Sequence, residues 1–230
     1  MPTINDAEFG EIVVKRQALA SNISLRIAPD GRLRISLPKH TPMFAAKALV
    51  SSSRRQIRKL VGEHQDNFSY TSDQQIGKSH HLRIQRNGDM PEVKISGTHI
   101  IATIPQDIAI QSQAAQQLIR DKILVALRKE AKGYLPRRLK FLADKYQFSY
   151  EKVKLTHASS RWGSCSSSGT ISLNIALMNL PFELLDYVLI HELSHTRHMN
   201  HSDKFWREVG AIDPDYKRHR SALKNYTPHI

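Results

Sequence analysis

Residues 191–195 of this 230-residue chain read H-E-L-S-H, which is an H-E-x-x-H pattern. On a helix, residues four apart project from the same face, so His191 and His195 can present two imidazoles to one metal ion. Glu192 lies beside the first imidazole and can take a proton from a water bound at that metal. The pattern therefore predicts a metal centre that activates water for hydrolysis.

A hydrolytic zinc site needs a third protein ligand and keeps its fourth position for water. His201 gives the extended spacing H-E-x-x-H-x5-H. This spacing requires the helix to stop after His195, and Met199-Asn200 is expected to stop it because Asn tolerates the left-handed backbone that ends many helices. We expect His201 to be the third ligand, since His198 would continue the helix and point past the metal. Glu208 is the alternative, in a site of two histidines and one carboxylate.

The helix that carries this motif is expected to span residues 182–198, opened by Leu180-Pro181, because Pro favours the start of a helix. Its sequence is apolar almost all round near the motif, which indicates burial. Two imidazoles and a carboxylate buried there need partners, and one cation would satisfy all three. The alternative is a pair of core histidines bonded to backbone groups, with Glu192 at the surface.

The first half of the chain is expected to be sheet-rich. Pro29-Asp30-Gly31 and Asn87-Gly88 have turn compositions, the latter typical of a hairpin, and Ser96-Gly97 is a further turn. Apolar residues recur at helical spacing over residues 42–65. We therefore predict a twisted antiparallel sheet with one helix packed on it, and the alternating segments predicted to form its strands are residues 23–27, 33–37, 82–84, 93–95 and 100–104.

The second half of the chain has a long helical pattern where the first half has mainly strand patterns. A helical pattern covers residues 108–146, and Pro136 is expected to end or kink that helix. Two short strands are predicted at 153–156 and 171–175, separated by a Ser/Gly-rich loop at 159–169. The fold class is therefore α+β, with a sheet-rich N-terminal region over residues 1–106 and a second domain over residues 107–230.

Composition excludes several classes of protein. Hydrophobic residues make up 40% of the chain and charged residues 24%, which is ordinary for a globular protein. The single cysteine, Cys165, excludes an intramolecular disulfide framework and a cysteine-based zinc finger. No apolar run reaches the roughly 18 residues of a membrane span. The first residues lack the basic and apolar segments of a secretory signal, so a cytoplasmic location is expected.

The chain is strongly basic, with a net charge of +13. The excess is densest in residues 109–150, which hold 9 basic and 3 acidic side chains. Such a balance favours nucleic acids, nucleotides or acidic proteins as partners. The densest cluster could follow phosphates or could equally be the solvated face of a helix, and it consists of Lys132, Arg137, Arg138 and Lys140.

Further motifs surround the metal-binding pattern: Arg161-Trp162-Gly163-Ser164-Cys165, Gly169-x-Ile171-x-Leu173-Asn174, Leu180-Pro181, Leu185-Asp186-Tyr187-Val188, Met199-Asn200-His201-Ser202 and Phe205-Trp206. Together they resemble the YgjP-like metal-dependent hydrolases, relatives of the WLM and SprT-type zincin metallopeptidases. The resemblance is dense over residues 135–222 and looser upstream. It implies a zincin-like fold for the second domain, ligand roles for His191, His195 and His201, and a general-base role for Glu192.

Three functions follow from these features. The first is a zinc-dependent metallopeptidase that acts on a peptide or protein, with zinc favoured because three imidazoles suit it better than they suit Mg²⁺ or Mn²⁺. The second keeps the metal site but hydrolyses the phosphoanhydride bond of a nucleoside triphosphate, as the basic charge suggests. The third is a basic nucleic-acid-binding protein with a structural metal.

Other residues near the motif have a less direct link to the chemistry. Cys165 is expected to be a half-buried thiol and not a nucleophile. Trp162 and Trp206 are expected to pack around the site, Asn174 could help to hold a substrate backbone, and His80-His81 is expected at the surface of a strand edge. The sequence does not identify the donor that stabilises an oxyanion, and the candidates are Arg161, Tyr187 and Tyr216.

Overall fold

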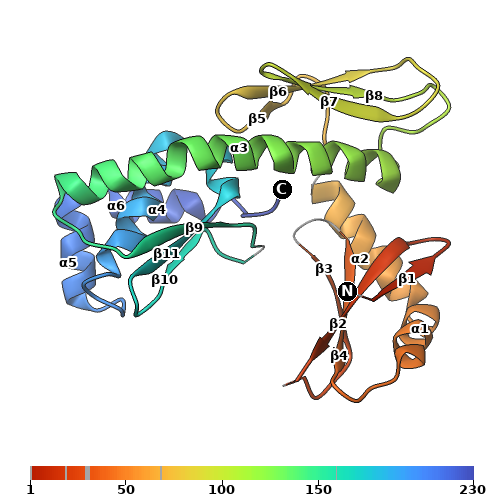
Figure 1. Cartoon of the computed structure of the whole chain (residues 1–230), viewed down its shortest axis with the longest axis horizontal. Helices are drawn as coiled ribbons and strands as arrows, with labels where there is room; N and C mark the ends of the chain where they lie inside the picture. The colour runs from red at the N-terminus through yellow and green to blue at the C-terminus, as the bar shows by residue number, and fades with distance from the viewer. Residues whose placement is uncertain (1, 19, 29–31, 68, 159) are drawn as a thin grey trace. The chain divides into compact units, whose positions relative to one another are not determined.

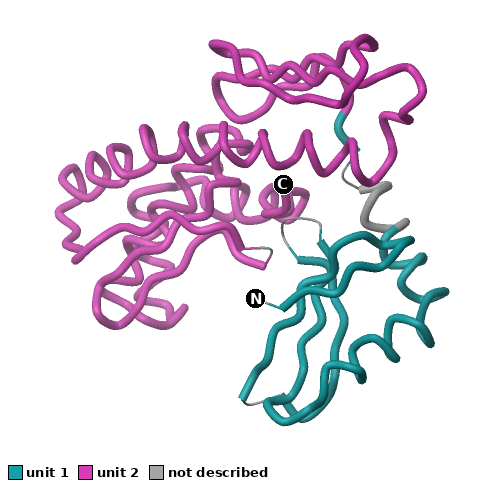
Figure 2. The backbone as a smooth tube through the Cα atoms, turned by 45° about the vertical axis from the view of Figure 1, so that its right-hand side comes forward, with its two compact units in different colours: residues 1–70 teal, residues 71–230 magenta. Residues whose placement is uncertain are grey.

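The computed structural model describes residues 2–18, 20–28, 32–67, 69–158 and 160–230. It confirms an α+β fold, with a sheet-rich N-terminal part and a helix-rich C-terminal part (Figure 1). The chain forms two compact units, Met1–Tyr70 and Thr71–Ile230 (Figure 2). The domain boundary expected near residue 106 stays a prediction. The turn expected at Pro29-Asp30-Gly31 lies outside the described residues.

The first unit contains a four-stranded sheet in the order β1-β2-β4-β3. Strands β2 and β4 run parallel, and the other pairs are antiparallel. The predicted strands at 23–27 and 33–37 are confirmed as the β3–β4 pair. Side chains of β2 and β4 form a dry core, in which Ile12, Val14, Ile35 and Leu37 are fully buried. The strands are β1 (Thr3–Asp6), β2 (Gly10–Gln17), β3 (Ser24–Ile27) and β4 (Leu33–Pro38).

The single helix expected over residues 42–65 is wrong, because the segment forms two helices, α1 (Met43–Ser52) and α2 (Arg54–Asn67). The break falls at Ser53, at the end of a run of three serines. Serine side chains compete for backbone groups and so weaken a helix interior. The hydroxyl of Ser52 does this by donating to the Leu49 carbonyl at 3.2 Å.

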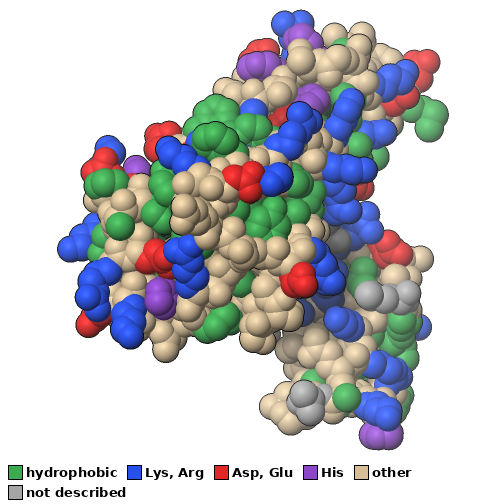
Figure 3. Space-filling view, turned by 60° about the vertical axis from the view of Figure 1, so that its left-hand side comes forward, with side chains coloured by type: hydrophobic (Ala, Val, Ile, Leu, Met, Phe, Trp, Pro, Cys, Tyr) green, Lys and Arg blue, Asp and Glu red, His purple; other side chains and the backbone are tan. Residues whose placement is uncertain are grey.

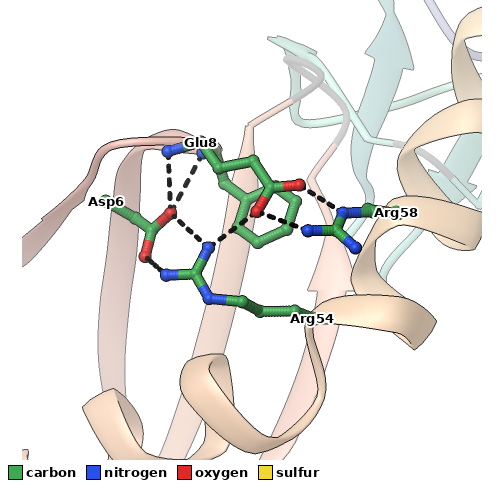
Figure 4. A network of polar contacts seen from close by, with 5 residues as sticks. Asp6, Glu8, Arg54 and Arg58 are labelled. Atoms are coloured by element: carbon green, nitrogen blue, oxygen red, sulfur yellow. Dashed lines mark hydrogen bonds and ion pairs between the residues drawn. The ribbon is translucent and has the colours of Figure 1, made fainter.

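A group of ion pairs fastens α2 to the turn between β1 and β2 (Figure 4). Arg54 contacts Asp6 at 2.8 Å and Glu8 at 2.7 Å, and Arg58 also pairs with Glu8. The Asp6 carboxylate in turn accepts the backbone N–H groups of Glu8 and Phe9. The side chains of Arg54, Glu8 and Arg58 are about one-third or more exposed, whereas that of Asp6 is 10% exposed. Pairs among the exposed side chains orient α2 and add little to stability.

The second unit begins with another four-stranded sheet, in the order β5-β6-β8-β7. The turn at Ser96-Gly97 joins an antiparallel pair, as expected, but the hairpin expected at Asn87-Gly88 is wrong because β6 pairs in parallel with β8. The first half therefore forms two mixed sheets and not one antiparallel sheet. Alternating apolar residues identify strands without specifying their partners. The strands are β5 (Gln75–Ile76), β6 (His80–Gln85), β7 (Glu92–Ser96) and β8 (His99–Thr103).

The long helix α3 (Gln113–Lys145) contacts this sheet through β7 and β8, and it also contacts α4 and β9. The hydroxyl of Ser112 caps its first turn by accepting the Ala115 N–H. Pro136 does not end the helix, which continues to Lys145, and a kink at this residue stays a prediction. Leu135 and Leu139 on either side are fully buried, so tertiary packing here outweighs the preference of proline.

A three-stranded sheet and three helices complete the second unit. The predicted strands at 153–156 and 171–175 are confirmed as a parallel pair, and a third strand, β10, lies in the segment expected to be a loop. The strand order is β10-β11-β9. The elements are β9 (Lys152–Thr156), β10 (Gly163–Cys165), β11 (Thr170–Asn174), the 3-10 helix η1 (Ile175–Asn179), α4 (Phe182–Ser194), α5 (Asp203–Ile212) and α6 (Tyr216–Leu223).

Among the helices of the described residues, none combines the length and the apolar character needed to cross a membrane.

A buried carboxylate joins the turn before β6 to α3. Glu130 accepts the backbone N–H groups of Lys78 at 2.7 Å and Ser79 at 3.0 Å, and its Oε1 lies 2.5 Å from Nδ1 of His80. His80 is buried, so the expectation that it lies at the surface is wrong, whereas its neighbour His81 is exposed. Because Glu130 provides three bonds at once, it is the main polar link between this turn and α3.

We predict that Glu130→Ala lowers the free energy of unfolding by about 3 kcal/mol or more, because two backbone N–H groups and a buried imidazole lose their acceptor. Chemical denaturation monitored by circular dichroism measures this loss. Asp144→Ala on the same helix is the control, because Asp144 pairs with Lys140 at the exposed surface and should change stability by about 0.5 kcal/mol or less. Equal losses in the two variants would contradict the assignment.

Candidate metal centre

The three histidines of the H-E-x-x-H-x5-H pattern come together. One ring nitrogen from each of His191, His195 and His201 lies within 4.8 Å of the other two. The Nε2 atoms of His191 and His201 are 3.1 Å apart. His191 lies in the last turn of α4, His195 caps that helix and His201 lies just before α5. The chain therefore places the three predicted side chains around one point.

The helix ends earlier than expected. Helix α4 stops at Ser194, so the prediction that it runs to residue 198 and stops at Met199-Asn200 is wrong. His198 lies outside the helix, and its carbonyl accepts a hydrogen bond from Nδ1 of His195 at 3.0 Å. Because a carbonyl can only accept, Nδ1 of His195 carries the proton and Nε2 keeps its lone pair. The turn that follows α4 thus orients the His195 ring through the backbone carbonyl of His198.

An apolar ring underlies the three imidazoles. Phe205 on α5 is fully buried, and its ring centre lies 4.9 Å from that of His191, 4.6 Å from that of His195 and 4.9 Å from that of His201. Trp206 stacks on His201 with an angle of 19° between the rings. The expectation that Trp206 packs around the site is therefore confirmed. The sequence named Phe205 as part of the Phe205-Trp206 motif but gave it no role, because an apolar side chain carries no chemical signal.

The donor set fits a tetrahedral cation. Nitrogen ligands at about 2.0–2.1 Å from zinc lie about 3.3 Å from one another in a tetrahedral site, close to the 3.1 Å between the His191 and His201 nitrogens. Burial lowers the pKa of His191 to about 3, and the charges of the other two histidines act in the same direction. Burial also lowers the pKa of His195. Neutral imidazoles with free lone pairs are the form that binds a metal.

The alternative third ligand, Glu208, has other partners. Its Oε1 lies 2.5 Å from Nη1 of Arg197, and its Oε2 lies 3.4 Å from Nε2 of His198. The group of side chains that could hold one metal ion contains His201 and not Glu208. The structure thus brings Glu208 to the neighbouring polar group and not to the three imidazoles.

Glu192 lies on the inner side of α4 and is buried. Its Oε2 has no hydrogen-bond partner among the described residues. Burial raises the pKa of Glu192 to about 8, and the positive charge of Arg161 opposes this rise. A carboxylate with increased affinity for a proton, beside a cluster of imidazoles, is suited to accept a proton from water.

Strand β10 lies against Glu192 at Gly163, and Asn174 holds residues that precede this strand. The side-chain amide of Asn174 donates to the carbonyls of Ala158 at 2.6 Å and Arg161 at 3.0 Å, and its oxygen accepts the Ala176 N–H. Asn174 is fully buried. Because its polar atoms are engaged in this way, the suggested role in holding a substrate backbone is not supported, and Asn174 instead fixes the loop.

The three candidates for stabilising an oxyanion occupy different surroundings. Arg161 is exposed and acts electrostatically on Glu192. Tyr187 is buried, with its ring centre 6.0 Å from that of His191, and burial raises its pKa to about 12. Tyr216 stacks on Trp206 at an angle of 17°. Of the three candidates, Arg161 is the one that is both positively charged and exposed to solvent.

Cys165 has the character expected of a half-buried thiol. Burial raises its pKa, and the nearby negative charge of Glu192 adds to that effect. A thiol with a raised pKa carries little thiolate and is a poor nucleophile. Cys165 is therefore poorly suited to act as a nucleophile at this site.

The basic cluster on α3 is partly neutralised. Arg138 contacts Asp186 through two nitrogens, and Lys140 pairs with Asp144. Acidic side chains also lie among the Lys and Arg side chains on the face that Figure 3 shows. Half of the cluster is thus occupied by internal partners, which weakens the argument for a continuous phosphate-binding surface.

A buried helix with an H-E-x-x-H motif and a third converging histidine defines the class of metal-dependent hydrolases. The sequence profile described as "YgjP-like, metallopeptidase domain" matches residues 21–226, and the chain belongs to this family. Membership supports a metal-dependent hydrolase and implies a divalent metal.

Comparison with individual proteins adds one similar structure. The chain is 29% identical to the metallopeptidase zymogen abylysin of Pyrococcus abyssi, with a TM-score of 0.36, over 39% of this chain and 91% of that chain. No curated protein sequence matches.

We predict that the purified protein binds about one zinc ion per chain and that His191→Ala, His195→Ala or His201→Ala each removes most of it, because three imidazoles are the proposed ligands. Glu208→Gln should retain zinc, since its carboxylate pairs with Arg197. Metal analysis after dialysis against a weak chelator measures the stoichiometry. Loss of zinc in Glu208→Gln together with its retention in His201→Ala would reassign the third ligand.

Proposed function

We propose that this chain is a zinc-dependent metallopeptidase in which His191, His195 and His201 hold the metal and Glu192 is the general base. The observation that carries the proposal is the convergence of three imidazoles beside a buried carboxylate with an unpartnered oxygen. Membership of a metallopeptidase family supports a peptide or protein as the substrate.

When bound, the zinc ion would polarise the substrate carbonyl and the attacking water. Glu192 then accepts a proton from that water as the water oxygen forms a bond to the carbonyl carbon. The same carboxyl group delivers the proton to the amide nitrogen as the C–N bond breaks. Burial of Glu192 keeps this proton from bulk solvent. The exposed guanidinium of Arg161 is the group we propose for stabilising the oxyanion.

The bond that is cleaved is tested by a substrate screen. The zinc-loaded protein is incubated with labelled casein, a mixed peptide library and nucleoside triphosphates, each with and without a chelator. We expect chelator-sensitive cleavage of casein or peptides. Hydrolysis of nucleoside triphosphates alone would contradict the peptidase proposal while leaving the metal site in place.

We predict that Glu192→Gln retains zinc and folds normally but loses hydrolysis by roughly a hundredfold or more, because glutamine keeps the size of the side chain and removes the base. Zinc content, thermal denaturation and the rate of casein cleavage are measured on the same preparation. Loss of zinc along with activity would mean that Glu192 is a ligand or a structural group. Full activity with zinc bound would mean that another residue activates the water.

A further inference from the structure

Gly163 in β10 contacts the side chain of Glu192. A Cβ atom built on Gly163 would lie 2.7 Å from both Cγ and Oε1 of Glu192 and 2.8 Å from its Cδ. These separations are shorter than any that a real Cβ atom tolerates, so an alanine here would displace its neighbour. The strand backbone and the carboxylate arm are therefore in direct contact.

The need for glycine at this position is one of space and not of backbone conformation. The glycines with positive φ angles are Gly10, Gly77, Gly88, Gly97 and Gly169, and Gly163 is not among them. Any residue could adopt its extended backbone. Because Gly163 has no side chain, the side chain of Glu192 can occupy the space next to it.

The strand cannot easily retreat from Glu192. Gly163 pairs with the fully buried Leu173 in the antiparallel β10–β11 ladder, and the carbonyl of Trp162 accepts the Asn174 N–H at 2.8 Å. The buried side chain of Asn174 also holds the carbonyl of Arg161. An added methyl group would thus act on Glu192, whose backbone is fixed in α4.

We propose that Gly163 is the positioning residue for Glu192, because it gives the carboxylate arm a backbone wall that sets its place next to the three imidazoles. This inference rests on the proposed role of Glu192 as general base. A base must lie within hydrogen-bond reach of the proton that it accepts, and a displacement of about 1 Å can cost up to a hundredfold in rate. The collision produced by a methyl group would cause a displacement of this size.

The test is a double-mutant cycle on casein cleavage by the zinc-loaded protein. Gly163→Ala should lower kcat about ten- to a hundredfold with little change in KM and with zinc retained. Glu192→Ala lacks Cγ, Cδ and Oε1, which are the three atoms that the added Cβ meets. Adding Gly163→Ala to Glu192→Ala should therefore lower the residual rate by less than about threefold further. An equal loss in both backgrounds would overturn the inference, because it would show that the glycine serves the strand alone.

The matched control is Gly133→Ala on α3, where the nearest atom to the added Cβ is Nη2 of Arg137 at 3.9 Å, and activity should not change. If Gly163→Ala fails to fold, recovery of folding in the double variant supports the contact, and failure of both overturns it. Full activity of Gly163→Ala beside an inactive Glu192→Gln would refute this inference alone. Full activity of Glu192→Gln would instead refute the proposed function.

Discussion

The packing of three imidazoles against one buried phenyl ring is the constraint on which the site depends. Phe205 places the rings of His191, His195 and His201 at nearly equal distances from its own centre. The three ring nitrogens are thereby held close together, and the burial that brings them together also keeps His191 neutral. Because Phe205 belongs to α5, this contact also links α5 to the end of α4.

The sheet β10-β11-β9 supplies a second surface against Glu192, which α4 alone does not provide. Helix α4 places Glu192 beside the ligands, but a side chain with several rotatable bonds needs a second surface to fix its position. Strand β10 provides that surface, and Asn174 holds both the strand and the loop before it. Helix α3, which also contacts α4, connects this region to the sheet β5-β6-β8-β7 through contacts that include the buried Glu130.

The sequence predicted which side chains converge better than it predicted the architecture that positions them. The motif identified His191, His195 and His201 because their spacing and donor atoms are readable one residue at a time. The end of α4 at Ser194 was not predictable in this way, since it depends on a bond from the His195 ring to the His198 carbonyl. Strand β10 escaped prediction because Gly163-Ser164-Cys165 has low strand propensity and is ordered by its pairing with β11. The parallel β6–β8 pair and the continuity of α3 through Pro136 are likewise tertiary effects.

The order in which the site forms follows from how far apart its parts lie along the chain. All three imidazoles belong to an eleven-residue segment, whereas Gly163 lies 29 residues before Glu192. Closing a short loop costs less entropy than closing a long one, and local contacts form earlier in folding. A folding chain is therefore expected to bring the three imidazoles together before Glu192 meets Gly163. On the proposed function, metal binding and the alignment of the base would then be separate steps of folding.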